Sequence, residues 1–243
     1  TMVHADVHYL DYLNAKVHFS GHRIVLVGYD DERGVAFVAD NDRDTIQECS
    51  LSNLRKARSA SYLPQPADNT FYRFTVPSEL TPIREAIPQA LQKAVRYNIG
   101  LGSGEYRFRY EGAEVAQGIE GLRDLSLEMA EWPLRMEEDK LTLVCKNLYV
   151  SLEKGGTGYG GNFRRMYGRF LVESAGVLSL PALAELGREF IAIGDLWSRL
   201  SLNFKALSGD GAEAVKRGVP LASQIYKRER AGFEKLAELV SGL

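Results

Sequence analysis

The stretch HFSGHRIVLVGYDDERGVAFVAD, residues 18–40, decides the fold of the first part of the chain. Its segment from Ile24 to Val27 is apolar on both faces, which is typical of a central strand. The turn DDERG follows, with Gly34 supplying a positive φ, and reverses the chain into VAFVAD. We therefore expect two adjacent antiparallel strands, the first opening at His22 and the second closing at Asp40.

Weaker patterns on both sides extend the expected sheet. Residues 3–9 alternate between apolar and polar side chains, with the period of two that a half-buried strand requires. Residues 45–49 and 70–77 are predicted as further strands. Between them, Ser50 or Ser52 is expected to cap a short helix that runs through Ala57.

From Thr81 onward the apolar period changes to 3.6 residues, which predicts helices. Thr81 is the expected N-cap of a first helix that has Pro82 at its start, ends near Tyr97 and is followed by glycines at 100, 102 and 104. Further helices are expected at 115–131, 138–153, 163–175, 181–206 and 218–241. The sequence thus predicts an α+β fold, an antiparallel sheet over residues 1–78 followed by a mainly helical domain over residues 79–243.

Two apolar stripes at helical spacing are predicted to be core, with a cofactor-binding stripe as the alternative. They are Phe163, Met166, Tyr167, Phe170 and Leu171, and Phe190, Ile193, Trp197, Leu200 and Phe204.

The composition excludes several classes of protein. A formal charge of −2 gives no general attraction to nucleic acid or to an anionic membrane. No apolar run reaches the roughly 18 residues that spanning a bilayer requires, and the first residues lack the features of a signal peptide. Two cysteines make neither a disulfide framework nor a metal knuckle, so a reducing, cytoplasmic compartment is expected.

Histidines cluster at positions 4, 8, 18 and 22. A tight turn between two strands of similar length brings Asp40 back to the level of His22. An imidazole at the start of a strand, hydrogen-bonded to a carboxylate on the next strand, would form two members of a catalytic triad, the general base and the group that orients it. Gly21 would let the backbone pass close to a substrate.

Two other interpretations of the histidines stay open. A metal site could use all four, because His4 and His8 share a face of the predicted strand, although zinc motifs usually place their close pair on a helix or combine it with cysteines. A histidine at a strand end can also simply be satisfied by a nearby carboxylate. Spacing alone does not separate this structural role from catalysis.

The histidine segment resembles that of papain-like cysteine enzymes, in which a histidine begins a strand and an aspartate ends the next. The closer likeness is to the family named after the butirosin-biosynthesis acyltransferase, whose preceding motif is matched here by Asp6, Tyr9, Leu10, Tyr12 and His18. The segments GTGYGGNFRRMYGRFLVESA, residues 156–175, and DLWSRLS, residues 195–201, resemble the helical companion domain of that family.

This resemblance implies acyl transfer. An acyl group would pass from a carrier-protein thioester to an active-site cysteine and then to an amine of a small-molecule acceptor. His22 would be the general base and later acid, Asp40 would orient it, and Asp6, Tyr9, Tyr12 and His18 would lie near the substrate. An acyl carrier protein is the implied partner and its phosphopantetheine the substrate arm, with no bound cofactor or metal; the oligomeric state is not specified. Residues 1–78 would be the second half of a papain-like domain.

The nucleophile departs from the family pattern. The family's cysteine lies upstream of every residue in this chain, while Cys49 and Cys145 are expected to be buried small apolar residues. The thiol would come from an earlier segment or from a separate chain. A hydrolase that uses water as acceptor, a non-catalytic module that binds a ligand or partner, and an N-terminal nucleophile at Thr1 remain alternatives.

A glycine-rich segment, residues 155–161, precedes Asn162, which is expected to cap the next helix. Arg164 and Arg165 lie in the first turn of that helix. Free N–H groups, the helix dipole and two guanidiniums could bind an anion such as the phosphate of phosphopantetheine. A flexible loop between two helices is the alternative.

Overall fold

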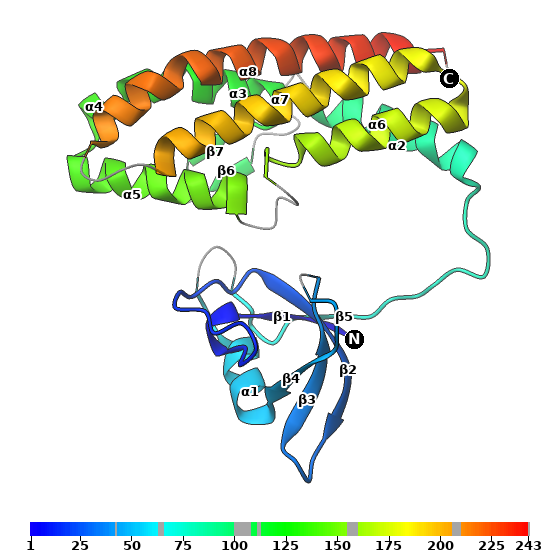
Figure 1. Cartoon of the computed structure of the whole chain (residues 1–243), viewed down its shortest axis with the longest axis vertical. Coiled ribbons are helices and arrows are strands. Elements are labelled where there is room, and N and C mark those ends of the chain that lie inside the picture. Colours follow the sequence, from blue (N-terminus) through cyan, green and yellow to red (C-terminus); the bar gives the residue numbers. More distant parts are fainter. Residues whose placement is uncertain are drawn as a thin grey trace. The chain divides into compact units, whose positions relative to one another are not determined.

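The computed structural model describes residues 1–41, 43–62, 66–99, 108–110, 113–154, 160–205 and 210–242. The chain divides into two compact units, Thr1–Leu80 and Thr81–Leu243. The first contains a five-stranded antiparallel sheet and the second is mostly helical (Figure 1). The predicted α+β class is therefore confirmed.

The sheet is built around the hairpin that the sequence predicted. Its strands are β1 (Met2–Ala5), β2 (His22–Asp30), β3 (Val35–Ala39), β4 (Gln47–Ser50) and β5 (Phe71–Tyr72), in the order β4-β3-β2-β1-β5. β2 is central, as expected. The turn before β3 has Gly34 at φ 68°, and Asp30 accepts a hydrogen bond from the Arg33 N–H at 2.9 Å.

Two predicted strands are shorter than expected. The prediction for residues 3–9 is wrong beyond Ala5, because the Asp6 side chain accepts from the His8 N–H and caps a 3-10 turn, η1 (Val7–Tyr9). The prediction for residues 70–77 holds only for Phe71 and Tyr72. These two residues pair with Val3 and Met2 of β1.

One short helix, α1 (Leu51–Ser59), packs on one face of the sheet. Ser50 is its N-cap, with its hydroxyl accepting from the Asn53 N–H at 3.3 Å, as predicted. Asp11 fixes the same end, accepting from the Ser50 N–H at 2.7 Å. The core between helix and sheet consists of Val3, Ala5, Leu10, Ile24, Ala36, Val38, Cys49, Leu54 and Ala57.

The second unit contains one more short sheet and most of the helices. The helices are α2 (Ile83–Asn98), α3 (Gly118–Glu128), η2 (Met129–Glu131), α4 (Trp132–Arg135), α5 (Glu138–Tyr149), η3 (Val150–Lys154, a π-helix), α6 (Arg164–Leu178), α7 (Pro181–Lys205) and α8 (Gly211–Val240). Pro82 rather than Thr81 precedes the first turn of α2. The hairpin of β6 (Phe108–Tyr110) and β7 (Ala113–Val115) was not predicted, and Gly100, Gly102 and Gly104 lie outside the described residues.

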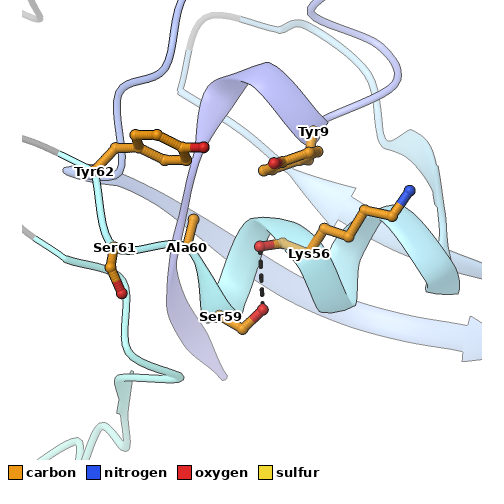
Figure 2. A pocket seen from close by; sticks show the side chains of 6 residues that line it. All are labelled: Tyr9, Lys56, Ser59, Ala60, Ser61 and Tyr62. Atoms are coloured by element: carbon orange, nitrogen blue, oxygen red, sulfur yellow. Dashed lines mark hydrogen bonds between the residues drawn. The ribbon is translucent and has the colours of Figure 1, made fainter.

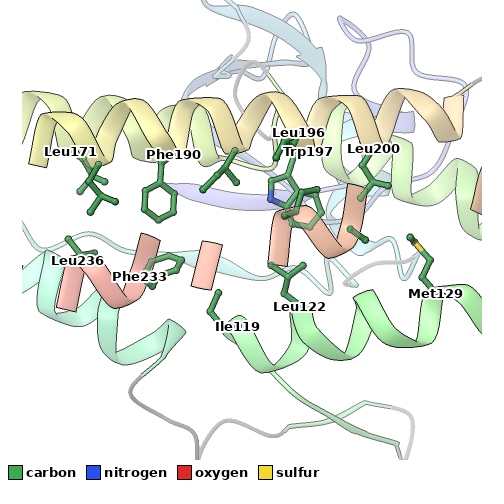
Figure 3. Close-up of a cluster of buried hydrophobic side chains, with 14 of the residues drawn as sticks. Ile119, Leu122, Met129, Leu171, Phe190, Leu196, Trp197, Leu200, Phe233 and Leu236 are labelled. Atoms are coloured by element: carbon green, nitrogen blue, oxygen red, sulfur yellow. The ribbon is translucent and has the colours of Figure 1, made fainter. Parts of the chain in front are cut away.

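Helix α7 forms the centre of the helical core and packs against α6 and α8. Its predicted stripe of Phe190, Ile193, Trp197, Leu200 and Phe204 is buried, which confirms that prediction (Figure 3). The stripe that begins at Phe163 is only partly core, because Phe163 and Met166 are 41% and 49% exposed.

Glycines bring α6 and α7 into backbone contact. A Cβ added at Gly168 would lie 2.5 Å from the carbonyl oxygen of Gly187. One added at Gly187 would lie 2.6 Å from the carbonyl oxygen of Gly168. The two helices can cross this closely only because neither residue has a side chain. Among the described helices, none combines the length and the apolar character that crossing a membrane requires.

Candidate active site

The hairpin of β2 and β3 brings His22 and Asp40 together. His22 is the first residue of β2, opposite Ala5 of β1, and Asp40 directly follows the last residue of β3. Ile24 and Val38, two residues along the same strands, are both buried in the core under α1. Because strand side chains alternate between faces, His22 and Asp40 lie on this same covered side of the sheet.

The two side chains are hydrogen-bonded. His22 Nε2 lies 2.8 Å from Asp40 Oδ2, and the same oxygen accepts from the Tyr12 hydroxyl at 2.7 Å. The Asn41 N–H donates to Asp40 Oδ1 at 2.8 Å. The Asp40 side chain is fully buried, while that of His22 keeps 21% of its surface exposed. The carboxylate is thus fixed from three sides and the imidazole remains reachable.

Asp40 is held in its ionised form. Burial alone would raise its pKa, but the hydrogen bonds from His22, Tyr12 and the Asn41 N–H outweigh burial and leave the pKa below its ordinary value. An ionised carboxylate only accepts hydrogen bonds, so the proton of a neutral His22 ring lies on Nε2. Nδ1 then carries a lone pair, and no hydrogen bond from the described residues reaches it. The free base of the pair is Nδ1.

A second histidine–aspartate pair lies in the same unit. His18 Nδ1 is 3.1 Å from Asp6 Oδ2, so here the free ring nitrogen is Nε2. Asp6 is fully buried and also accepts from the His8 and Phe19 N–H groups and from the Ser20 hydroxyl. Burial opposes its ionisation, yet these hydrogen bonds hold its pKa below the ordinary value.

Aromatic rings surround His18. The ring of Tyr62 stacks on it with centroids 3.7 Å apart, and the ring of His8 lies 4.2 Å away. Tyr9 makes a tilted contact at 5.5 Å. Tyr62 also donates its backbone N–H to the Ser20 hydroxyl.

The candidate residues of the first unit therefore fall into two groups. Tyr12 joins His22 and Asp40, whereas Tyr9 and His18 gather around Asp6. Substrate binding by these residues stays a prediction. The sequence pattern did not indicate Ser20 and Tyr62, because nothing in the spacing shows that residues 42 positions apart are hydrogen-bonded.

The premise of the metal interpretation is wrong. His4 and His8 do not share a strand face, because β1 ends at Ala5 and His8 lies in η1. His4 is fully buried and its Nε2 lies 2.9 Å from the Tyr72 hydroxyl, while His8 Nδ1 lies 3.1 Å from the Ala15 carbonyl oxygen. Within the part of the chain that the structure describes, no three His, Cys, Asp or Glu side chains gather as a metal site would need.

Neither cysteine has the properties of a nucleophile. Cys49 in β4 and Cys145 in α5 are both buried, and burial raises the pKa of each thiol to about 11. Catalytic thiols have a lowered pKa and are accessible. Both side chains are instead part of the two cores, as expected.

The start of α6 differs from the predicted anion site. Asn162 is not the N-cap; that position belongs to Phe163, whose φ is 63°, and the carbonyl of Asn162 instead accepts from Arg164. Arg164 forms a bidentate ion pair with the buried Glu229, and Arg165 forms an ion pair with Asp195. Both guanidiniums are thus balanced by carboxylates, and substrate binding by these three residues stays untested. The predicted loop at 155–159 lies outside the described residues.

Comparison with known families adds to this geometry. Residues 52–236, most of the chain, match the family model described as a domain of unknown function, DUF4872. The chain belongs to the DUF4872 family. Residues 1–41 match a second model, described as the N-terminal part of butirosin biosynthesis protein H. No curated protein matches the chain.

The second match confirms the predicted resemblance for the segment that contains both His22 and Asp40. The DUF4872 match begins within α1 and ends within α8, so it spans part of the sheet unit as well as the helical unit. In this DUF4872 chain the histidine–carboxylate pairs therefore lie in the segment shared with a protein of butirosin biosynthesis.

Proposed function

We propose that this chain supplies the base and the orienting carboxylate of a cysteine-dependent acyltransferase. The acyl donor would be a carrier-protein thioester and the acceptor a small-molecule amine. The observation that carries the proposal is the His22–Asp40 pair, with Nε2 bound to a buried, ionised carboxylate and Nδ1 free. The match of residues 1–41 to a protein of butirosin biosynthesis supports it.

The chemistry follows from this geometry. His22 Nδ1 takes the proton of the attacking thiol, and the thiolate adds to the thioester carbonyl. The carrier thiolate leaves with the proton that His22 returns, which yields an acyl-cysteine. The amine then attacks this acyl group, His22 accepts the amine proton, and the cysteine leaves as a thiol. Asp40 stabilises the imidazolium in both half-reactions.

The nucleophilic thiol of this proposal comes from outside the sequence, because Cys49 and Cys145 are buried with raised pKa values. The chain by itself is therefore expected to form no acyl adduct. It would contribute the base, its orienting group and the substrate-binding side chains.

The test uses the polypeptide of the whole reading frame, incubated with an acyl-carrier-protein thioester and followed by intact mass. We expect an acyl adduct on a cysteine, formed at least about 100-fold more slowly in His22→Ala. His8→Ala is the matched control, since the His8 ring lies against Tyr9, His18 and the Ala15 carbonyl oxygen rather than against His22 or Asp40.

Adduct formation by His22→Ala at an undiminished rate would show that His22 is not the base. Absence of any adduct in the wild-type polypeptide would show that it carries no nucleophilic thiol of its own, and would leave a thiol on a separate chain or a non-catalytic binding module. Release of free acid in place of amide, with a range of amines present, would favour a hydrolase that uses the same residues.

A further inference from the structure

A cavity in the sheet unit lies beside the second histidine–aspartate pair. Its volume is about 410 Å³, within the range of small-molecule sites. Tyr9, Lys56, Ser59, Ala60, Ser61 and Tyr62 line it, from η1, from the last turn of α1 and from the residues that follow α1 (Figure 2). Tyr9 and Tyr62, two of its walls, are the rings that contact His18.

The electrostatic environment of this cavity favours a cation. Burial, the neighbouring Tyr62 and the charge of the buried Asp6 raise the pKa of Tyr9, so negative charge is disfavoured at this position. The carbonyl end of α1, where the helix dipole is negative, forms another side, although its last turn also carries Lys56 and Arg58. Ser61 donates to the Asp68 carboxylate at 3.2 Å, which places one more negative charge beside the cavity.

The walls offer what a primary ammonium binds. Tyr9 and Tyr62 each contribute an aromatic ring, whose faces attract a cation, and one face of Tyr62 is covered by the stacked ring of His18. The hydroxyl oxygens of Tyr9, Tyr62 and Ser59 can accept its N–H groups. Lys56 is the cationic lining residue, but its Nζ donates to Asn53 at 3.3 Å, and Figure 2 shows the nitrogen directed away from Tyr62.

We propose that this cavity between Tyr9 and Tyr62 binds a protonated primary amine of the acceptor substrate, one other than the amine that is acylated, because an ammonium group has no lone pair with which to attack. The role of the ligand as acyl acceptor rests on the proposed function. The binding itself requires no acyl donor and no cysteine, so its test is independent of acyl transfer.

The test is an NMR titration of the chain with 1,4-diaminobutane, 1,4-butanediol and inorganic phosphate as probes. We expect the diamine to cause saturable shifts at Tyr9, Ala60, Tyr62 and the His18 ring, and the neutral diol to cause none. Tyr62→Leu should weaken diamine binding about 5-fold or more, because it removes one π-face. Tyr29→Leu is the matched control, since Tyr29 is 69% exposed at the far end of β2.

Lys56→Gln tests the sign of the ligand charge. Because Lys56→Gln removes a positive charge, it should raise the affinity for a cationic ligand. The expected increase is about 2- to 3-fold, since the charge lies at the surface and is screened by solvent. Phosphate that saturates the same signals and binds more weakly to Lys56→Gln would overturn the proposal in favour of an anion site. Diamine shifts that are absent, that do not saturate, or that persist unchanged in Tyr62→Leu would overturn it as well.

Discussion

At the scale of single residues, the structure assigns different surroundings to the histidines. His22 and His18 are each hydrogen-bonded through one ring nitrogen to a buried carboxylate, and each keeps part of its side chain exposed. His4 is fully buried, with its Nε2 against the Tyr72 hydroxyl. The first two can exchange protons with a ligand, while His4 can influence only stability.

His4 should make the sheet unit sensitive to mild acid. Burial, reinforced by the charge of Arg23, lowers its pKa below the ordinary 6.5. Protonation of His4 therefore favours the unfolded state. The free energy of unfolding is highest above pH ~6.5 and decreases as the pH falls from there toward the pKa of His4 in the folded state. Hydrogen exchange of the β1 and β2 amides between pH 7.5 and 5 measures this loss. His4→Gln should reduce the slope, and His8→Gln should not; equal slopes in all three proteins would contradict the assignment.

Asp40 and Tyr12 should contribute unequally to the proposed acyl transfer. Asp40→Asn removes the charge that stabilises the imidazolium and permits the wrong tautomer, so acyl-adduct formation should slow by about 100-fold or more. Tyr12→Phe removes one of the described hydrogen bonds to the ionised Asp40 carboxylate and should cost about 1.5–3 kcal/mol of stability, with a much smaller effect on rate. Intact-mass kinetics and urea unfolding measure the two effects. Comparable rates for Asp40→Asn and wild type would mean that Asp40 has only a structural role.

At the scale of elements, the close crossing of α6 and α7 depends on glycine. Gly187→Ala places a methyl group 2.6 Å from the Gly168 carbonyl oxygen, so the helices must separate. We expect a loss of about 1–3 kcal/mol in the free energy of unfolding. The control is Gly176→Ala on α6, where an added Cβ meets nothing within 4 Å and helix propensity favours alanine. Urea unfolding should show opposite signs for the two variants; a neutral Gly187→Ala would mean that the crossing adapts freely.

The buried carboxylate of Glu229 joins three helices. It accepts from Arg164 of α6 and from the indole N–H of Trp197 on α7, and it belongs to α8. Glu229→Gln leaves a partly buried guanidinium without its charge partner and should cost about 3 kcal/mol or more. The exposed pair of Glu234 and Arg230 provides the control, because Glu234→Gln should cost less than about 0.5 kcal/mol. Thermal unfolding measures both, and similar Tm values for the two variants would contradict the prediction.

Elements with a strong local pattern were predictable, whereas features fixed by single side-chain contacts, or masked by stronger neighbouring patterns, were not. The hairpin from His22 to Asp40 follows from its apolar run and from Gly34, and the stripe on α7 follows from periodicity. The end of β1 could not be foreseen, because it depends on the Asp6 side chain, which turns to the His8 N–H instead of continuing the alternation. The β6–β7 hairpin did carry a sequence signal, namely two short runs of strand-forming residues separated by Glu111 and Gly112. The helical patterns on both sides obscured this signal.

The same distinction applies to the candidate site. His22 and Asp40 meet through a local reversal, so their contact could be predicted. Tyr62 reaches His18 across a separation of 44 positions in sequence, and Arg164 of α6 pairs with Glu229 of α8 across 65 positions. Such partners depend on packing between elements, which no short pattern encodes.

At the scale of the whole molecule, the two units have separate cores. Both tryptophans, Trp132 and Trp197, belong to the helical unit, so tryptophan fluorescence reports on that unit alone. Gly187→Ala should therefore shift the fluorescence midpoint in urea while leaving hydrogen exchange of β1 and β2 unchanged. His4→Gln should produce the reverse pattern. Coincident shifts of both probes in either variant would show that the units unfold as one.

The choice of ring nitrogen at His22 also limits the direction from which a reactant can arrive. Nδ1 is joined through Cγ to Cβ, so the nitrogen left available lies near the main chain at the head of β2, whereas the outer edge of the ring is occupied by Asp40. In the proposed acyl transfer, an incoming sulfur atom would therefore approach on the main-chain side of the ring, beside the first residue of β2.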